Sequence, residues 1–127
     1  MRQRAAPGER PLHWVGSSRK DLLDCPSGVI DNIGYALSAV QFGERPPSAK
    51  PWKGLGPGVW EIVEDDASGT YRAAYTVRFQ KAVYVLHVFQ KKSPSGARTA
   101  RPDVELIKAR LKEAKRHYEE RYGEKAD

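Results

Sequence analysis

Cysteine is nearly absent from this sequence: Cys25 is the only one in 127 residues. One thiol cannot build an internal disulfide framework, and its isolation agrees with a reducing compartment. No apolar run approaches the roughly 18 residues that a membrane span requires, and the N-terminal ten residues lack the apolar segment of a signal peptide. From these absences we expect a cytoplasmic protein.

Metal and nucleophile motifs are also missing. The three histidines are far apart in the sequence, and no segment has a zinc-ligand or HExxH spacing. There is no GxSxG nucleophile elbow, no phosphate-binding glycine loop and no dinucleotide fingerprint. The sequence therefore predicts neither a metal site nor a cofactor.

Positive charge is present in excess. The chain carries 22 lysines and arginines against 16 aspartates and glutamates, which gives a net charge of +6 and a pI near 9.5. Such a charge attracts polyanions, so nucleic acid, the ribosome or an acidic protein are natural partners, although many small basic proteins bind nothing anionic. The arginine-rich residues 1–10 predict a disordered basic tail, followed by a single domain over residues 11–123.

Helical periodicity occupies the first third and the end of the domain. After a short strand-like PLHWVG segment, a brief helix is predicted up to Pro26 and a second one over residues 27–43. These two helices form a hairpin with one apolar face. A last helix opens at Pro102 with one narrow apolar stripe, which is typical of a helix packed along one edge, either on its own sheet or on a partner.

Three strand-like runs lie between these helices, at residues 59–65, 70–79 and 82–92. Short turns separate them, so they predict an antiparallel meander. Residues 43–58 before them hold four prolines and four glycines and predict a long loop without regular structure, with a functional role. The whole pattern is that of an α+β fold.

Cations gather at one predicted end of this sheet. Lys53 lies on the long loop and Arg72 in the middle strand, while Lys91 and Lys92 mark the exit of the last strand. In an antiparallel meander the start of the second strand lies across from the end of the third, so these groups can share one rim. The alternative for the lysine pair is a solvated strand end, and for Arg72 a surface position or a salt bridge with Glu61.

Three linked segments carry a further signal: AKPWKGLGPGVWEI, TYRAAYTV and YVLHVFQKKS follow a strand, a helical hairpin and a basic loop in a fixed order. In that order they resemble the phage-derived, HigB-like branch of the RelE/ParE toxin superfamily. The resemblance covers about residues 11–113. It leaves out the basic tail and the final part of the last helix.

The resemblance implies a RelE-like α+β fold, with a curved antiparallel sheet made of a three-stranded meander plus an N-terminal strand, an N-terminal helical hairpin and a C-terminal helix. It also implies the toxin of a type II toxin-antitoxin system. Such toxins are ribosome-dependent mRNA endonucleases, or mRNA interferases, which need no metal and inhibit translation by cutting mRNA in the ribosomal A site. Their partner is a cognate helix-turn-helix antitoxin of the HigA type.

The same resemblance implies catalytic roles for four cations. The arginine of its YR-x-x-Y pattern corresponds to Arg72, and the loop lysine of its K-P-x-K-G pattern to Lys53. The lysines of its F-x-K-K-S pattern correspond to Lys91 and Lys92. Glu61 on the adjoining strand is expected either to orient Arg72 or to be only its salt-bridge partner.

Further residues are expected to bind RNA: Lys50, Tyr75, Arg78, His87 and Phe89. Aromatic rings stack on unpaired bases in many RNA-binding proteins, but a histidine or an aromatic residue in a strand is more often part of the core. His87 stands where the family pattern has H-G-F, and this chain has Val88 in place of the glycine. That departure affects the local backbone freedom.

These residues suggest a metal-free mechanism. RNA cleavage through its own 2′-hydroxyl needs a base, an acid for the departing oxygen and positive charge on the phosphate. Arg72 fits the last role, and crowding by other cations favours the neutral form that a lysine base requires. Two alternatives stay open: a ParE-like toxin that acts on gyrase, and an inactive phage-derived protein that binds only nucleic acid or its antitoxin.

Overall fold

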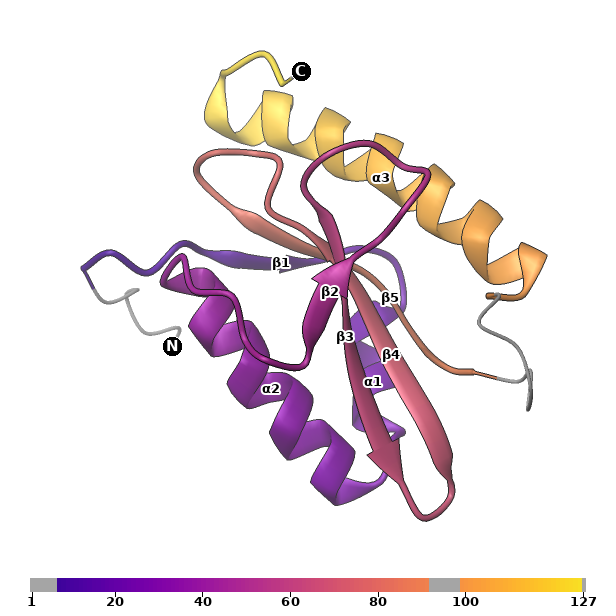
Figure 1. Ribbon diagram of the computed structural model, residues 1–127. Helices are drawn as coiled ribbons and strands as arrows, with labels where there is room; N and C mark the ends of the chain where they lie inside the picture. The colour runs from indigo at the N-terminus through magenta and orange to yellow at the C-terminus, as the bar shows by residue number, and fades with distance from the viewer. Residues whose placement is uncertain (1–6, 92–98, 127) are drawn as a thin grey trace.

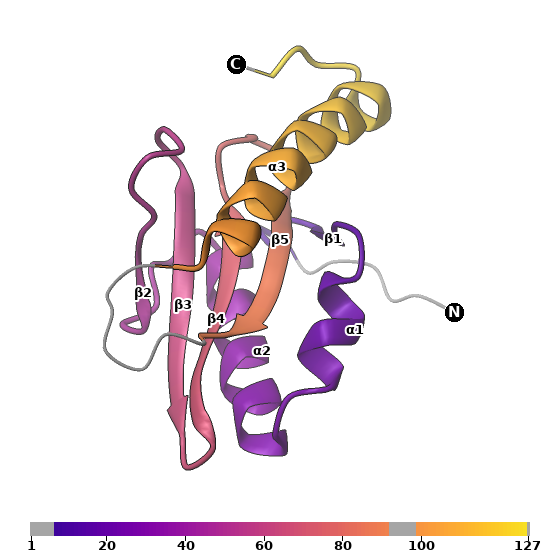
Figure 2. The same ribbon diagram turned by 90° about the vertical axis from the view of Figure 1, so that its right-hand side faces the viewer.

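The computed structural model describes residues 7–91 and 99–126 and has an α+β architecture. A curved five-stranded sheet runs through the middle, and helices cover both of its faces (Figures 1 and 2). The strand order is β1-β5-β4-β3-β2. The strands are β1 (Leu12–Trp14), β2 (Ala49–Pro51), β3 (Val59–Asp66), β4 (Gly69–Thr76) and β5 (Val83–Gln90).

The central strands β3, β4 and β5 form the predicted antiparallel meander. β1 pairs with β5 in parallel, so the sheet is mixed rather than wholly antiparallel. The ladder between them is short, and the amide of Val83 extends it by donating to the carbonyl of Pro11 at 2.9 Å. The α+β class, the meander and the N-terminal strand are confirmed, and the direction of that strand is a correction.

The proline-rich segment 43–58 contains a strand that the sequence analysis did not predict. Residues Ala49–Pro51 pair antiparallel with β3 and form the edge of the sheet. Three residues are too few for an alternating pattern to be visible, and an edge strand tolerates a proline because one side of its backbone needs no partner. The expectation of a loop without regular structure was therefore wrong for these three residues.

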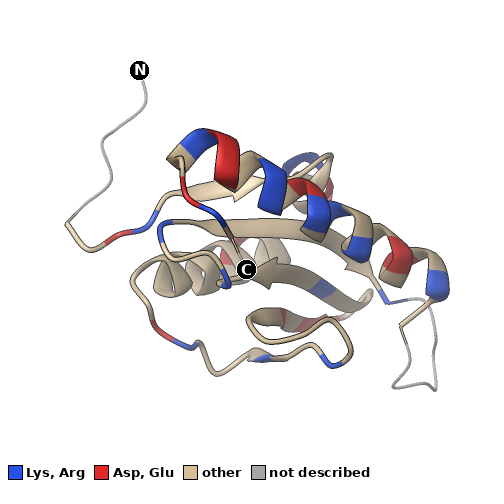
Figure 3. Ribbon diagram, turned by 90° about the horizontal axis from the view of Figure 1, so that it is seen from above, with Lys and Arg blue, Asp and Glu red and all other residues tan. Residues whose placement is uncertain are grey.

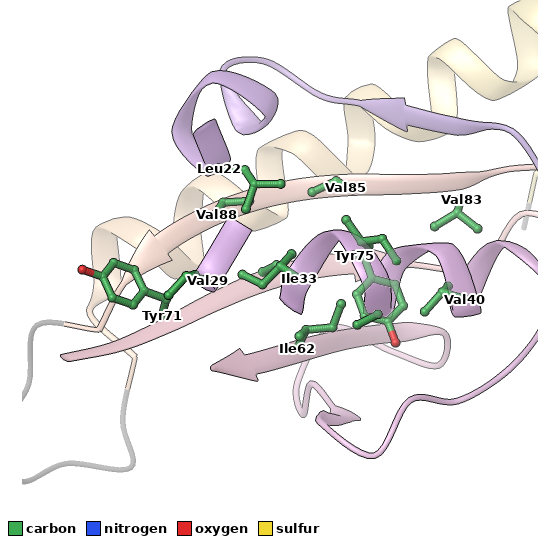
Figure 4. Packing of buried hydrophobic residues seen from close by; sticks show 13 residues of the cluster. Leu22, Val29, Ile33, Val40, Ile62, Tyr71, Tyr75, Val83, Val85 and Val88 are labelled. Atoms are coloured by element: carbon green, nitrogen blue, oxygen red, sulfur yellow. The ribbon is translucent and has the colours of Figure 1, made fainter. Parts of the chain in front are cut away.

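Two helices form the predicted hairpin on one face of the sheet: α1 (Ser18–Leu23) and α2 (Ser27–Gln41). Pro26 separates them, and Gly43 follows α2 with a φ of 87°, a conformation that glycine adopts without strain. The buried side of α2 packs on alternate residues of the central strands (Figure 4). This apolar layer is the larger of the two cores.

The C-terminal helix α3 (Arg101–Tyr122) crosses the opposite face of the sheet (Figure 2). Its buried residues Ile107, Ala114 and Tyr118 belong to one core with Ala74 of β4 and with Tyr84 and Leu86 of β5. The narrow apolar stripe of this helix is thus used by its own sheet and not reserved for a partner. Within the described part of the chain, no helix is long and apolar enough to cross a membrane.

The ends of the described chain are bound to the domain. The amide of Arg10 donates to the carbonyl of Gln41 at 2.8 Å, and Nε2 of Gln41 donates back to the carbonyl of Arg10 at 2.8 Å. At the other end Ala126 is buried, and its amide donates to Glu119 Oε2. The packed domain therefore includes Arg10 and extends past residue 123.

Candidate active site

Strand alternation carries Arg72 and Glu61 to the face of the sheet that α3 covers. Glu61 lies opposite Ala74, whose side chain packs in the α3 core, and Arg72 is two residues before Ala74 on the same strand. Nη1 of Arg72 donates a hydrogen bond to Oε1 of Glu61 at 2.9 Å. The two side chains are 7% and 9% exposed. Arg72 and Glu61 thus form a buried ion pair.

This ion pair borders a cleft of about 530 Å³ between the β2 edge and the start of α3. The residues that line it include Lys50, Trp52, Lys53, Glu61, Arg72 and Val104. Lys50 belongs to β2 and lies opposite Glu61 in the ladder with β3. Because Lys53 follows three residues later, the unpredicted strand brings two lysines to the same cleft as Arg72.

A β-bulge in β5 directs His87 to the same face of the sheet. The pairing of β5 with β4 shifts after Ala74, and both Leu86 and His87 lie on the α3 side as a result. Nε2 of His87 lies 2.7 Å from Oδ1 of Asp103, in the first turn of α3. The imidazole ring also stacks on Phe89, with 4.7 Å between ring centroids and 13° between ring planes.

Asp103 is the site residue that the sequence analysis missed. An aspartate in the first turn of a helix is expected for its favourable interaction with the helix dipole alone, so it gave no separate signal. The available hint was His87, because a histidine inside an apolar strand needs a polar partner. The partner is sixteen positions away in the sequence, beyond the reach of any local pattern.

Two buried side-chain nitrogen atoms have no hydrogen-bond partner within the described residues: Nε of Arg72, which borders the cleft, and Nδ1 of His87, on the same face of the sheet. Buried polar atoms are nearly always paired, so each exception calls for an explanation such as a bound ligand or water. Nε2 of His87 faces the Asp103 carboxylate, and Nδ1 is the ring nitrogen that has no partner in the described part of the chain.

The predicted lysine pair lies at the exit of β5. The amide of Lys91 donates to the carbonyl of Thr70 at 2.8 Å, so the backbone ladder continues one residue past the strand end. Thr70 is two residues from Arg72 on β4. Lys91 is half-buried at the rim that also carries Arg72, whereas Lys92 lies outside the described residues.

Tyr75 and Arg78 do not join the candidate site. Tyr75 points to the α2 face, where it is 2% exposed, and burial raises the pKa of its hydroxyl to about 12 (Figure 4). Arg78 lies beyond the opposite end of β4, where its guanidinium donates to the carbonyls of Leu55 at 2.6 Å and Pro57 at 3.0 Å. Tyr75 is a core residue, and Arg78 binds the loop before β3.

No cluster of three or more histidine, cysteine, aspartate or glutamate side chains that could hold a metal ion occurs in residues 7–91 and 99–126. The cleft is instead dominated by positive charge, with Lys50 and Lys53 beside the Arg72–Glu61 pair. Arginine and lysine donors suit a phosphate or carboxylate ligand.

Comparison with known proteins identifies a family and a likeness to solved structures. The family model described as "Phage derived protein Gp49-like" matches residues 20–112. Among solved structures, a chain of the toxin-antitoxin complex RelBE2 from Mycobacterium tuberculosis is similar at 20% sequence identity, over 65% of this chain and 99% of that chain, with a TM-score of 0.47. No curated protein matches the chain.

Proposed function

The chain belongs to the phage-derived Gp49-like family, and on this basis we propose that it is the toxin of a type II toxin-antitoxin pair. Its activity is that of a metal-independent endoribonuclease, which cuts mRNA on the ribosome and so inhibits translation. The earlier resemblance to the phage-derived branch of the RelE/ParE superfamily agrees with this family.

One observation carries the proposal: Arg72 lines a cationic cleft with one guanidinium nitrogen bound to Glu61, and its Nε has no partner among the residues that the structure describes. A guanidinium that a carboxylate already orients needs little rearrangement when a phosphate binds, so the free-energy cost of reorganisation is small. Lys50 and Lys53 on the same cleft add charge for the phosphate oxygens. A cleft of this composition suits a phosphodiester better than a neutral substrate.

The chemistry follows from these groups. The 2′-oxygen of the substrate attacks the adjacent phosphorus as its proton is removed, and the bond from phosphorus to the 5′-oxygen breaks as that oxygen gains a proton. Arg72 stabilises the charge that develops on the phosphate, and Glu61 holds Arg72 in place. Lys53 or Lys91 takes the 2′-proton, with the other lysines, Lys92 included, as acid or phosphate ligand.

His87 is the second candidate for proton transfer. Its hydrogen bond to Asp103 orients the ring, in the manner of a base positioned by a carboxylate. The stacked Phe89 restricts rotation of the ring. In this role Asp103 acts as a positioning residue.

A cognate helix-turn-helix antitoxin of the HigA type is the partner we propose for this toxin. The basic surface of the domain and α3 are suitable docking sites, since a charged surface favours an acidic partner segment and an exposed helix offers a groove. The antitoxin would keep the toxin inactive until it is degraded.

Inducing Arg72→Ala beside the wild-type protein in growing cells tests the proposal. The wild type should stop translation and leave transcripts cut inside codons. The variant should lose about 10²-fold to 10³-fold in cleavage rate, as when one transition-state donor is removed from an enzyme. Sequencing of transcript ends measures the cleavage, and binding to the antitoxin serves as the control for folding.

Two outcomes of this experiment would reject the ribonuclease assignment. DNA breakage without transcript cleavage would point to a ParE-like action on gyrase. If neither DNA breakage nor transcript cleavage occurs while binding to RNA or antitoxin is intact, the protein acts only by binding. Undiminished cleavage by Arg72→Ala would remove Arg72 from the mechanism while leaving the activity in place.

A further inference from the structure

A second cleft of about 250 Å³ lies between α3 and the loop that precedes β3. We call it the α3 groove. Its lining residues are Leu55, Arg78, Lys108, Leu111, Lys112 and Lys115. None of these residues belongs to the proposed catalytic set, although Arg78 was expected on sequence grounds to bind RNA.

The α3 groove lies further along α3 than the cleft of the candidate active site. Both hollows have the same two walls, α3 and the segment between β2 and β3. On α3, Val104 borders the active-site cleft, and Lys108 borders the groove one helical turn later. On the loop, Lys53 and Leu55 are two residues apart. The path from Val104 to Lys115 covers about 16 Å of helix, which is room for a few nucleotides.

Charge is concentrated along this path. Among the described residues that line the two clefts, seven are lysine or arginine and one is a carboxylate, which is Glu61 in its pair with Arg72. The whole chain has 22 cations and 16 acids, so the path is far more basic than the chain as a whole. Figure 3 shows lysines and arginines recurring along α3.

The loop wall of the groove is held in place by Arg78. Its guanidinium donates to two loop carbonyls, and its backbone lies against Gly58, where a Cβ atom would come within 3.0 Å of the Arg78 Cα. Gly58 also has a φ of 84°, a value that other residues rarely adopt. A wall fixed in this way preserves the groove without a ligand, which lowers the entropic cost of binding.

We propose that the α3 groove binds the RNA strand that flanks the scissile phosphodiester. Lys108, Lys112 and Lys115 contact successive phosphates, and the apolar side chains of Leu55 and Leu111 pack against riboses and bases. The inference rests on the proposed function and extends it, because it gives the substrate strand a direction away from Arg72. The alignment of the groove with the active-site cleft along α3 and the loop favours the substrate strand over ribosomal RNA or an acidic antitoxin segment.

Binding of a labelled 2′-O-methyl RNA oligonucleotide tests this inference without any cleavage. The variant is Lys108→Gln/Lys112→Gln/Lys115→Gln in the full-length protein, and fluorescence anisotropy gives its affinity across a salt series. Losing three phosphate contacts on a single strand should lower the slope of log K against log[salt] by about 2, since each contact contributes about 0.7. Affinity at low salt should fall about tenfold or more.

Two matched variants separate the groove from charge in general. Arg19→Gln/Lys20→Gln/Arg121→Gln removes three exposed cations outside the groove and should leave the slope nearly unchanged. Lys108→Arg/Lys112→Arg/Lys115→Arg keeps the charges and should retain the wild-type slope. Lengthening the oligonucleotide by a few nucleotides should tighten binding to the wild type and not to the glutamine variant.

Several results would overturn the inference. Equal slopes for the groove and control variants would show that only net charge matters. Normal oligonucleotide binding with weakened ribosome binding would assign the groove to ribosomal RNA, and normal oligonucleotide binding with weakened antitoxin binding would assign it to the antitoxin. A different result would reject the proposed function and keep the groove: the wild type binds RNA through the groove, and transcripts stay intact in cells.

Discussion

The two faces of the sheet are built from the same strands and differ sharply in chemistry. On the α2 face, Tyr71, Ala73 and Tyr75 of β4 pack into a continuous apolar layer (Figure 4). On the α3 face, the intervening residues of β4 begin with Arg72, whose charge is buried against Glu61. Alternation along one strand therefore assigns stability to one face and chemistry to the other.

The helices explain how this division is maintained. α2 has 15 residues and buries five apolar side chains against the sheet. α3 has 22 residues and buries three, and its remaining sides are polar and largely exposed. Clefts occur beside both helices, but only those beside α3 are lined by the Arg72–Glu61 pair or by the lysines of α3. The charged groups that line the clefts, and not the presence of a cleft, therefore distinguish the two faces.

The largest stability effect should come from breaking the buried pair on the α3 face. Glu61→Ala leaves the Arg72 charge buried without a partner, and such a change should lower the free energy of unfolding by about 3–5 kcal/mol. Arg72→Met/Glu61→Leu removes both charges and should restore stability close to that of the wild type, while cleavage stays abolished. Urea unfolding measures both variants. Equal destabilisation of single and double variants would contradict the idea that the pair serves function rather than stability.

A smaller effect should follow from changing the partner of His87. Asp103→Asn keeps the size of the side chain but removes the carboxylate that orients the His87 ring, so the cleavage rate should fall about 10²-fold. The decisive measurements are the cleavage rate and the thermal stability of the same variant. An unchanged cleavage rate with lower thermal stability would mean that Asp103 only anchors α3 to the sheet.

The smallest effect is expected from the α2 face. Ile33 is fully buried there, and Ile33→Val should cost about 0.5–1.5 kcal/mol of unfolding free energy through the small cavity it leaves. Cleavage per folded molecule should not change, because no part of the candidate site packs on α2. Chemical unfolding and transcript cleavage at low temperature measure the two quantities. A loss of cleavage without a loss of stability would contradict the assignment of stability to the α2 face and of chemistry to the α3 face.

Much of this division could be predicted from periodicity. The strand-like runs indicated the antiparallel meander, and the three- and four-residue spacing in α2 indicated a helix with one apolar side. The neighbouring positions of Arg72 and Glu61 followed from the meander, and their contact is confirmed. The roles of these residues, like those of Lys53 and Lys91, stay predictions.

Other features were out of reach of the sequence alone. Residues 49–51 form a strand only because β3 offers a free edge, and their own pattern does not reveal it. The bulge at Leu86 places two consecutive residues on one face, which strict alternation forbids. Tyr75 fits a stacking role in sequence terms, and only the register of β4 assigns it to the core.

By itself, the sequence determined the helices, the meander and the cationic character of one rim, because each depends on spacing within a few residues. The tertiary structure decided which charges meet: Glu61 with Arg72, His87 with Asp103, and the β2 lysines with the cleft. Those contacts depend on strand register and on where α3 crosses the sheet. Register and crossing are set by the packing of the whole domain, and no local pattern contains that information.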